Sequence, residues 1–214
     1  MIRKMNDNFV LIDNIYRSRM TLLDILESRG YDVDKYRKFS PAEASVAVSS
    51  FPSLSFKVYK KDDESKVCDV RYANISRGKL DTFFDDIDDD DTENTEVIVM
   101  IMGALADYYH ITALKQYMKP KESNPKEKRK LRVSFFSVAM IVVNPMNHYL
   151  VPKHELVPQD YHKTLMDSLY ITSKSKFPEI KFHVDPIARC IGAVPGDIVK
   201  ITRPSGYAGE AYVS

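Results

Sequence analysis

The sequence predicts an α/β (α+β) fold in two domains, residues 1–144 and 145–214. In the first domain, strand-like segments alternate with helix-like segments, which is typical of a sheet flanked by helices. Asn144 is followed by Pro145, a step that favours a turn or an extended linker over a continuing helix. A chain of 214 residues is long enough for one large or two small hydrophobic cores.

An amphipathic helix opens the first domain. Apolar side chains recur at helical spacing from Phe9 to Leu26, and Gly30 provides a stop at the C-terminal end. The segment 96–102 is apolar on both faces, so we expect it to be a buried central strand. The other predicted elements are a helix at 104–118 and strands at 55–60, 67–72 and 131–144, the last of which can bend.

A run of acidic residues interrupts this domain between Asp81 and Glu96. It holds nine carboxylates and no basic side chain. Like charges at this density repel one another and resist burial, so we expect a solvated, mobile loop. A divalent-ion loop is the alternative, but the run lacks the alternating spacing and the glycine of an EF-hand, which makes the solvated loop the better interpretation.

A basic run follows from Lys119 to Arg132, with seven basic and two acidic residues. Pro120 and Pro125 predict a loop or connector there. One hypothesis is a solubilising surface loop. The other is non-specific contact with a nucleic-acid backbone, which needs only lysine and arginine near phosphates. The residues that would make this contact are Lys126, Lys128, Arg129 and Lys130.

The second domain shows clear helix and turn signals. Asp185-Pro186 predicts a helix start, because the aspartate can cap amide groups and a proline in the first turn loses no hydrogen bond. Gly192 is the expected stop, and Pro195-Gly196 predicts a type II turn. The other predicted elements are an extended segment at 148–154, a helix at 159–170, a strand at 198–203, a turn at Gly206 and Gly209, and a return strand at 211–214.

Several charged residues are therefore expected on a compact domain rather than on loose loops. Lys153 and His154 present hydrogen-bond donors from the extended segment. Arg189, Lys200 and Arg203 would be preorganised charges, which lose little entropy when a partner binds. The alternative is that all of them are ordinary surface charges.

Three motifs of the second domain together resemble a known family. They are His148-Tyr149-Leu150-Val151-Pro152-Lys153-His154, Asp185-Pro186-Ile187-Ala188-Arg189 and Pro195-Gly196-Asp197-Ile198-Val199-Lys200-Ile201-Thr202-Arg203-Pro204-Ser205. These motifs resemble the C-terminal assembly domain of the fifth subunit shared by eukaryotic nuclear RNA polymerases, which has a small archaeal counterpart. The resemblance implies a non-catalytic subunit that joins the largest polymerase subunit and other polymerase subunits. The partner-binding residues expected on that basis are Lys153, His154, Asp185, Pro186, Arg189, Lys200, Arg203 and Ser205.

The segment Arg17 to Val33 resembles the opening helix and turn of the same family's N-terminal jaw domain. The resemblance implies a nuclease-like mixed sheet and a position along downstream DNA, with weak, non-specific contacts. The chain departs from the family where Gly206-Tyr207 follows Ser205 and where Cys190 replaces an aromatic residue. Such divergence suits a distant lineage, for example a polymerase encoded by a large DNA virus. The expected location is the nucleus for a cellular chain, and host cytoplasm and virion for a viral one.

Composition and spacing argue against an enzyme. The two cysteines are far apart, and the five histidines are scattered, so we expect no metal site and no disulfide framework. The sequence contains no phosphate-binding loop, dinucleotide turn or nucleophile motif, so we expect no cofactor and no catalytic residue. The alternatives that stay open are a nuclease-like nucleic-acid-processing enzyme and a polymerase-independent adaptor.

The net charge and the length of the apolar runs exclude further classes of protein. The formal net charge is +1, so the chain is no general polyanion binder, and any nucleic-acid contact must be local. The longest apolar runs, 97–104 and 138–143, are too short to span a bilayer, and the N-terminus lacks a signal-peptide core. We expect a soluble intracellular protein.

Overall fold

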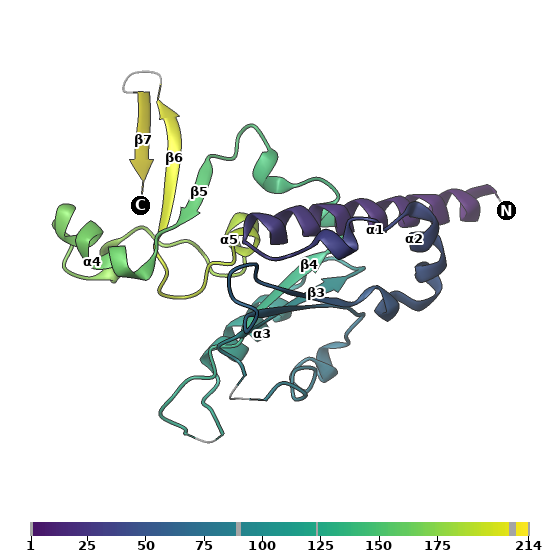
Figure 1. Ribbon diagram of the computed structural model, residues 1–214, viewed down its shortest axis with the longest axis horizontal. Coiled ribbons are helices and arrows are strands. Elements are labelled where there is room, and N and C mark those ends of the chain that lie inside the picture. The colour runs from purple at the N-terminus through teal and green to yellow at the C-terminus, as the bar shows by residue number, and fades with distance from the viewer. Residues whose placement is uncertain (1, 89–90, 123, 206–208, 214) are drawn as a thin grey trace. The chain divides into compact units, whose positions relative to one another are not determined.

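The computed structural model describes residues 2–88, 91–122, 124–205 and 209–213, with side chains described from Phe9 to Arg203 within these ranges. The chain forms two compact units, Met1–Asn144 and Pro145–Ser214. Helices and a mixed sheet make up the first unit, and a smaller sheet with short helices makes up the second (Figure 1). The predicted α/β class is therefore confirmed.

The first unit is built on a four-stranded sheet with the order β1-β2-β3-β4. Strand β1 runs antiparallel to β2, while β2, β3 and β4 run parallel to one another. Six of the seven residues of β3 are buried, as expected for a central strand covered on both faces. The bounds are β1 Phe56–Tyr59, β2 Val67–Tyr72, β3 Thr95–Ile101 and β4 Arg132–Ser137.

Helices cover this sheet. In Figure 1, α1 lies on one side of the strands and α3 on the other. Helix α1 buries Ile15, Leu22, Leu23 and Leu26, which recur at helical spacing, and Gly30 follows its end with a positive φ of 85°. The helices of this unit are α1 Ile2–Ser28, α2 Pro41–Ala47 and α3 Asp107–Met118, with 3-10 turns η1 Asp34–Tyr36, η2 Val48–Leu54, η3 Arg77–Lys79 and η4 Val138–Ile141.

The structure shortens the strand predicted at 131–144. Strand β4 ends at Ser137, and η4 follows as a 3-10 turn. Val138 and Ile141 are both buried, and η4 packs against α1. Their spacing of three residues is that of a 3-10 turn, in which both side chains reach the same side. An apolar run of this length does not by itself distinguish a strand from a turn.

The prediction that the acidic run is solvated throughout is wrong at Glu96. Most described residues from Asp81 to Glu93 form turns, and Asp86 accepts hydrogen bonds from Arg71 at 2.8 and 3.0 Å. Glu96 instead belongs to β3 and is 3% exposed. Its carboxylate accepts hydrogen bonds from Arg29 and from the hydroxyl of Tyr31, the latter at 3.0 Å. Neutralisation by Arg29 is what permits this burial.

The environment of Glu96 has opposing effects on its ionisation. Burial by itself disfavours the charged carboxylate, but the Arg29 charge and the hydrogen bonds from Arg29 and Tyr31 outweigh it and lower the pKa of Glu96 below its ordinary 4.5. Burial also raises the pKa of Tyr31 and of the Cys68 thiol, with the Glu96 charge acting in the same direction. Glu96 is therefore charged and Tyr31 and Cys68 are neutral at physiological pH.

The second unit holds a three-stranded antiparallel sheet with the order β5-β6-β7. Its core is small: the described part of this unit buries five apolar side chains, Ile187, Ala188, Cys190, Ile198 and Ile201. The predicted return strand is confirmed as β7, whereas the turn at Gly206 and the terminal Ser214 lie outside the described residues. The elements are η5 Pro145–Asn147, β5 Lys153–Leu156, α4 Gln159–Ser168, η6 Lys174–Lys176, α5 Pro186–Ile191, β6 Val199–Ser205 and β7 Gly209–Val213.

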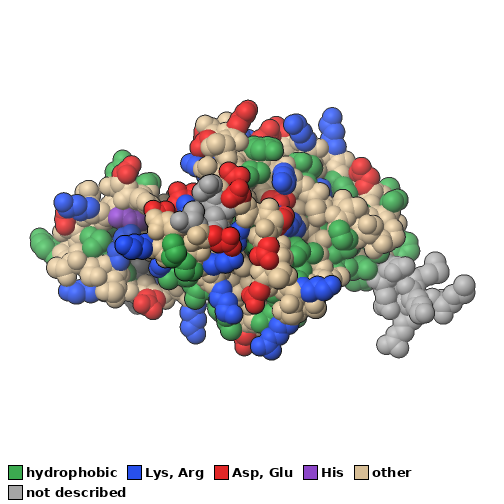
Figure 2. All heavy atoms as spheres, turned by 90° about the horizontal axis from the view of Figure 1, so that it is seen from below, with side chains coloured by type: hydrophobic (Ala, Val, Ile, Leu, Met, Phe, Trp, Pro, Cys, Tyr) green, Lys and Arg blue, Asp and Glu red, His purple; other side chains and the backbone are tan. Residues whose placement is uncertain are grey.

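Charge is well mixed on the surface. Over the face shown in Figure 2, acidic and basic side chains are interspersed with apolar ones, in keeping with the formal net charge of +1. Among the described helices, none combines the length and the apolar character that a bilayer crossing requires.

Replacing Glu96 with glutamine should destabilise the first unit by about 3 kcal/mol at neutral pH, because the Arg29 charge would remain buried without its counter-charge. The folded-state pKa of Glu96 is depressed, so its stabilising effect is present above pH 4.5 and is lost as the pH falls through the folded-state pKa. Urea unfolding of Glu96→Gln and of the original chain should therefore differ fully at pH 7, and the difference should shrink as the pH falls through the depressed pKa of Glu96.

Glu64→Gln is the control, because Glu64 is exposed. It should change the free energy of unfolding by less than about 0.5 kcal/mol at either pH. Equal stability of Glu96→Gln and the original chain at pH 7 would contradict a structural role for the ion pair.

Candidate functional site

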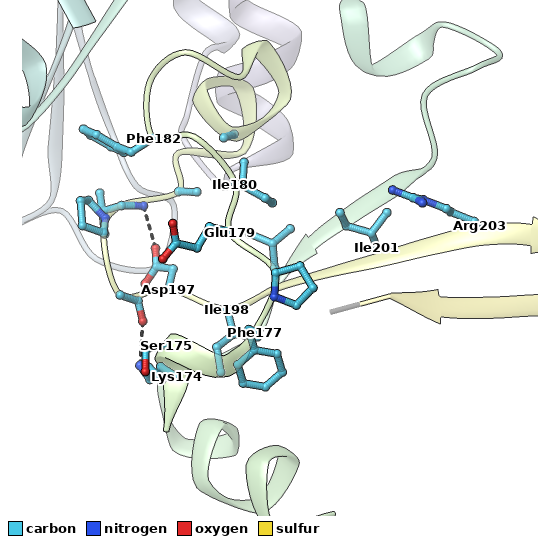
Figure 3. Close-up of a pocket in the computed structure, with 17 residues that line it drawn as sticks. Lys174, Ser175, Phe177, Glu179, Ile180, Phe182, Asp197, Ile198, Ile201 and Arg203 are labelled. Carbon is cyan, nitrogen blue, oxygen red and sulfur yellow. Dashed lines mark hydrogen bonds between the residues drawn. The ribbon is translucent and has the colours of Figure 1, made fainter. Parts of the chain in front are cut away.

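A cavity of about 540 Å³ opens in the second unit. Its wall combines the segment 174–182, the turn 194–197 and the strand β6 (Figure 3). Apolar side chains dominate the lining, and a few charged groups stand among them. The apolar lining includes Phe177, Ile180, Phe182, Ile198 and Ile201, and the charged lining is Lys174, Glu179, Asp197 and Arg203.

Hydrogen bonds fix the turn at one end of this cavity. The Asp197 amide donates to the Val194 carbonyl at 3.0 Å, and the Val194 amide donates to the Asp197 carboxylate at 2.9 Å. Gly196 has a φ of 96°, as the third position of a type II turn requires. The ammonium of Lys174 donates to the Gly196 carbonyl at 2.7 Å, which ties the turn to η6. Figure 3 shows Arg203 further along β6, away from the Asp197 turn.

Two residues predicted to bind a partner make contacts within the second unit. The Asp185 carboxylate accepts hydrogen bonds from the amides of Ile187 and Ala188, at 2.8 and 2.9 Å, and so caps α5. Arg189 is only 4% exposed, and burial lowers the pKa of its guanidinium. The side chain of Arg189 is therefore buried. One carboxylate oxygen of Asp185 accepts both hydrogen bonds from the helix.

Other predicted residues lie on the sheet of the second unit. The ammonium of Lys153 lies 2.8 Å from a Glu155 carboxylate oxygen and, by its hydrogen bond, lowers the pKa of that carboxyl. Lys200 stands directly across the β5–β6 ladder from Glu155. His154 is half-buried, with its Nδ1 2.7 Å from the Pro152 carbonyl oxygen.

Arg203, Pro186 and Ser205 complete the predicted set. Arg203 is exposed and lines the cavity. Pro186 is half-buried in the first turn of α5. Ser205 ends β6, and its side chain lies outside the described part of the structure.

Large apolar side chains on the surface of the second unit were missed by the sequence analysis. Tyr149, Leu150 and Tyr170 are 86%, 69% and 94% exposed. Four more apolar residues in the described part of this unit are also exposed: Leu156, Tyr161, Leu169 and Val184. Apolar side chains mark an interaction surface where they adjoin one another, as the neighbours Tyr149 and Leu150 do in sequence. Leu150 stood within a recognised motif, but the pattern gave no sign of its exposure.

The four residues predicted to contact nucleic acid divide into three that are exposed and one that is buried. Lys126, Lys128 and Lys130 are exposed. Arg129 is 1% exposed, and its guanidinium donates to Gln116 at 3.0 Å and to the carbonyls of Phe84 and Ile87. Arg129 therefore cannot meet a phosphate and instead fastens the basic segment to the core.

The described residues hold no cluster of three or more histidine, cysteine, aspartate or glutamate side chains able to bind a metal ion. Cys68 and Cys190 are free thiols, and both are buried. Two buried carboxylates of the first sheet are paired with arginines: Asp69 lies 2.9 Å from Arg71, and Glu96 bonds to Arg29. Each of these two carboxylates is therefore paired with a guanidinium.

The geometry defines a small, two-unit protein whose second unit displays apolar and charged groups around a sparse core. Residues 143–214 match the family model described as RNA polymerase Rpb5, C-terminal domain. Subunit Rpo5 of the DNA-directed RNA polymerase of Methanosarcina barkeri is 50% identical over 66 residues, which cover 31% of this chain and 82% of that subunit. The Archaeoglobus fulgidus Rpo5 subunit is 52% identical over 65 residues, 30% of this chain and 83% of that subunit.

A eukaryotic relative extends the match to nearly the whole chain. Subunit rpabc1 of DNA-directed RNA polymerases I, II and III from Dictyostelium discoideum is 28% identical over 201 residues, 93% of this chain and 94% of that subunit. The chain belongs to the Rpb5/Rpo5 family of RNA polymerase subunits. The resemblance inferred from the sequence motifs is confirmed, while a viral source stays a prediction.

Replacing Asp185 with alanine should cost about 1 kcal/mol, because two amides at the start of α5 would lose their acceptor. Amide hydrogen exchange of Ile187 and Ala188 should accelerate by about fivefold, the equivalent of that free energy. Asp185→Asn is the matched control, since asparagine caps helices about as well as aspartate. Unchanged exchange in the alanine variant would show that the cap does not hold α5.

Proposed function

We propose that this protein is a non-catalytic structural subunit of a multisubunit DNA-directed RNA polymerase. Its second unit docks on the largest subunit, and its first unit lies near downstream DNA. The observation that carries the proposal is the family match over residues 143–214, the same unit that exposes seven large apolar side chains among its described residues. A domain with so few buried apolar side chains gains stability when a partner covers its exposed ones.

The docking surface proposed for this unit combines the cavity with the charged ladder beside it. The cavity offers an apolar site of about 540 Å³ for a partner side chain, with Arg203 at one part of its wall. Lys153 and Lys200 supply charge on the sheet, and such charges set orientation more than affinity. The residues proposed to meet the partner are Lys153, His154, Pro186, Lys200, Arg203 and Ser205. Asp185 and Arg189 support this surface from within.

The first unit offers a smaller electrostatic surface. Lys126 and Lys128 are exposed, and Lys130 is exposed with a Glu93 carboxylate 3.4 Å away. Contacts of exposed lysines with phosphates are sequence-independent and weak, as a subunit that guides moving DNA requires. The pairing of Asp69 with Arg71 and of Glu96 with Arg29 supports this role over a nuclease, which needs carboxylates free to converge on a metal.

The proposal also bears on location. A chain that serves a eukaryotic polymerase works in the nucleus, where we place this protein if it is cellular. Incorporation into one, two or three polymerases would leave the proposed docking surface unchanged.

Affinity purification of the full tagged chain, followed by mass spectrometry, tests the proposal directly. The expected result is stoichiometric recovery of the two largest polymerase subunits, and their absence would favour a polymerase-independent adaptor.

Arg203→Glu should weaken incorporation into the polymerase by at least about tenfold, because it reverses an exposed charge on the proposed docking surface. The measurement is co-purification of the largest subunit at increasing salt. Lys35→Glu, the same reversal at an exposed site of the first unit, is the control and should leave recovery unchanged. Full recovery with Arg203→Glu would remove this residue from the interface.

Alanine at Lys126, Lys128 and Lys130 together should flatten the salt dependence of DNA binding by the assembled enzyme. The slope of log K against log salt should fall by about 0.9 for each phosphate that a lysine no longer neutralises. The same triple change at Lys35, Lys38 and Lys79, also exposed in the first unit, controls for net charge. If both triple variants give the original slope, the basic segment is a solubilising surface.

A further inference from the structure

Helix α3 has apolar side chains on two faces. One face packs on β4 and buries Tyr109, Thr112, Ala113 and Gln116. The other face exposes Ile111, Leu114 and Met118, which are 55%, 44% and 42% exposed. Spacings of three and four residues place these three side chains along one line of the helix. We call this line the α3 stripe.

An outward apolar stripe is unusual on a surface helix. The face of such a helix that points away from the core is normally polar, because apolar groups gain nothing by contact with water. The buried residues of α3 already give it a packed face, so the α3 stripe is not needed to hold the helix in place. Grouped apolar residues on a surface are characteristic of protein–protein contacts.

The chain after α3 is a folded hairpin rather than a loose tail. In Figure 1 it leaves α3, runs outward and returns to β4. The Lys121 amide donates to the Glu127 carbonyl at 2.9 Å, and the Arg129 amide donates to the Lys119 carbonyl at 2.7 Å. The Lys130 amide donates to the Tyr117 carbonyl at 3.1 Å, which joins the returning segment to the end of α3. We call the described residues of this segment, 119–122 and 124–130, the basic hairpin.

Arg129 fixes the basic hairpin relative to the helix. Its buried guanidinium donates to the side chain of Gln116, a residue on the inner face of α3. The ammonium of Lys128 lies 3.4 Å from the sulfur of Met118, so a cation of the hairpin touches the α3 stripe. Lys115 is exposed on α3 itself, four residues after Ile111 and therefore beside it on the helix surface.

The rim of the stripe is mainly basic. Lys115 and Lys128 flank it, and Lys119 is half-buried just beyond Met118. One acidic group nearby, Glu127, has partners within the hairpin. Its carboxylate accepts a hydrogen bond from the Asn124 side chain at 3.0 Å and lies 4.0 Å from the Lys121 ammonium. Glu122 lies in the hairpin, and Asp107 lies at the opposite end of α3. The C-terminal half of the stripe therefore presents apolar side chains between cations.

We propose that the α3 stripe and the flanking cations form a docking surface for an acidic, amphipathic helical segment of a protein partner. Apolar side chains on the partner would cover Ile111, Leu114 and Met118, and carboxylates beside them would meet Lys115 and Lys128. Helical segments bind such surfaces through apolar anchors three and four residues apart. Apolar side chains gain nothing from a phosphate backbone, which favours a protein over nucleic acid as the occupant. This surface goes beyond the proposed polymerase role and does not depend on it, and the two share only Lys128, whose ammonium can meet either a carboxylate or a phosphate.

The test uses the full chain and a defined probe. The probe is a labelled helical peptide of about 15 residues, with leucines at positions i, i+3 and i+7 flanked by glutamates. A second peptide carries lysines in place of the glutamates. Binding is followed by fluorescence anisotropy and by the methyl NMR signals of Ile111, Leu114 and Met118. The glutamate peptide should shift these methyl signals and bind at least about tenfold more tightly than the lysine peptide.

Variants locate the site. Leu114→Gln combined with Met118→Gln should weaken binding of the glutamate peptide by at least about tenfold. Glutamine is a good helix former, so α3 should persist, which circular dichroism would verify. Val46→Gln is the matched control, because Val46 is 76% exposed on α2 and lies outside the stripe. Lys115→Glu with Lys128→Glu should reverse the preference between the two peptides.

Any of the following results would overturn the proposal. The first is methyl shifts in the stripe with a DNA duplex but not with the glutamate peptide, which would make it a nucleic-acid surface. The second is concentration-dependent dimerisation, abolished in the Leu114→Gln and Met118→Gln double variant, which would make it a self-association surface. The third is equal binding of both peptides, or equal loss of binding in the Val46→Gln control.

Discussion

The buried ion pair between Arg29 and Glu96 is the constraint on which the first unit depends. It joins the turn after α1 to the start of β3, two places 67 residues apart in sequence. Tyr31 adds a hydrogen bond to the same carboxylate and pairs with Lys60 next to β1. The Glu96 carboxylate in β3 thus links the central strand to the segment between α1, the longest helix, and the edge strand β1. Because burial is costly for either charge alone, neither residue can be removed without exposing the other to an apolar interior.

Elsewhere, too, charged side chains divide into ones that shape the fold and exposed ones that can face a partner. Asp185 caps α5 and Arg189 is buried within that helix, so both help to shape the second unit. Arg203 and Lys200 remain on its surface. In the basic hairpin, Arg129 is inside and its lysine neighbours are outside. Arginine is suited to the inner role because its planar guanidinium can donate to several carbonyls at once.

Local chemistry in the sequence was enough to predict much of the fold. Strand β2 spans the predicted 67–72, and the Asp185 cap and the Gly192 stop follow from rules that involve a few neighbouring residues. Burial of Glu96 and Arg129 was missed because their partners are distant in the chain, and a run of like charges gives no local sign of them. The strand predicted to 144 ended at Ser137 because Val138 and Ile141 pack on α1 from a 3-10 turn, and their apolar character alone does not distinguish that turn from a strand. For the candidate site, the motifs pointed to the unit that holds the cavity, but the exposure of Tyr149 and Tyr170 depends on the packing around them.

The anchored hairpin gives the first unit a property that a disordered lysine-rich tail does not have. A flexible tail adapts to any anionic surface, and it discriminates only by the amount of charge it meets. In a hairpin pinned by Arg129, the ammonium of Lys128 lies 3.4 Å from the sulfur of Met118. Whatever approaches must match both a fixed spacing and a mixed chemistry. The contacts proposed for this surface would therefore select a partner by geometry as well as by charge, and the buried guanidinium of Arg129 would be the cause.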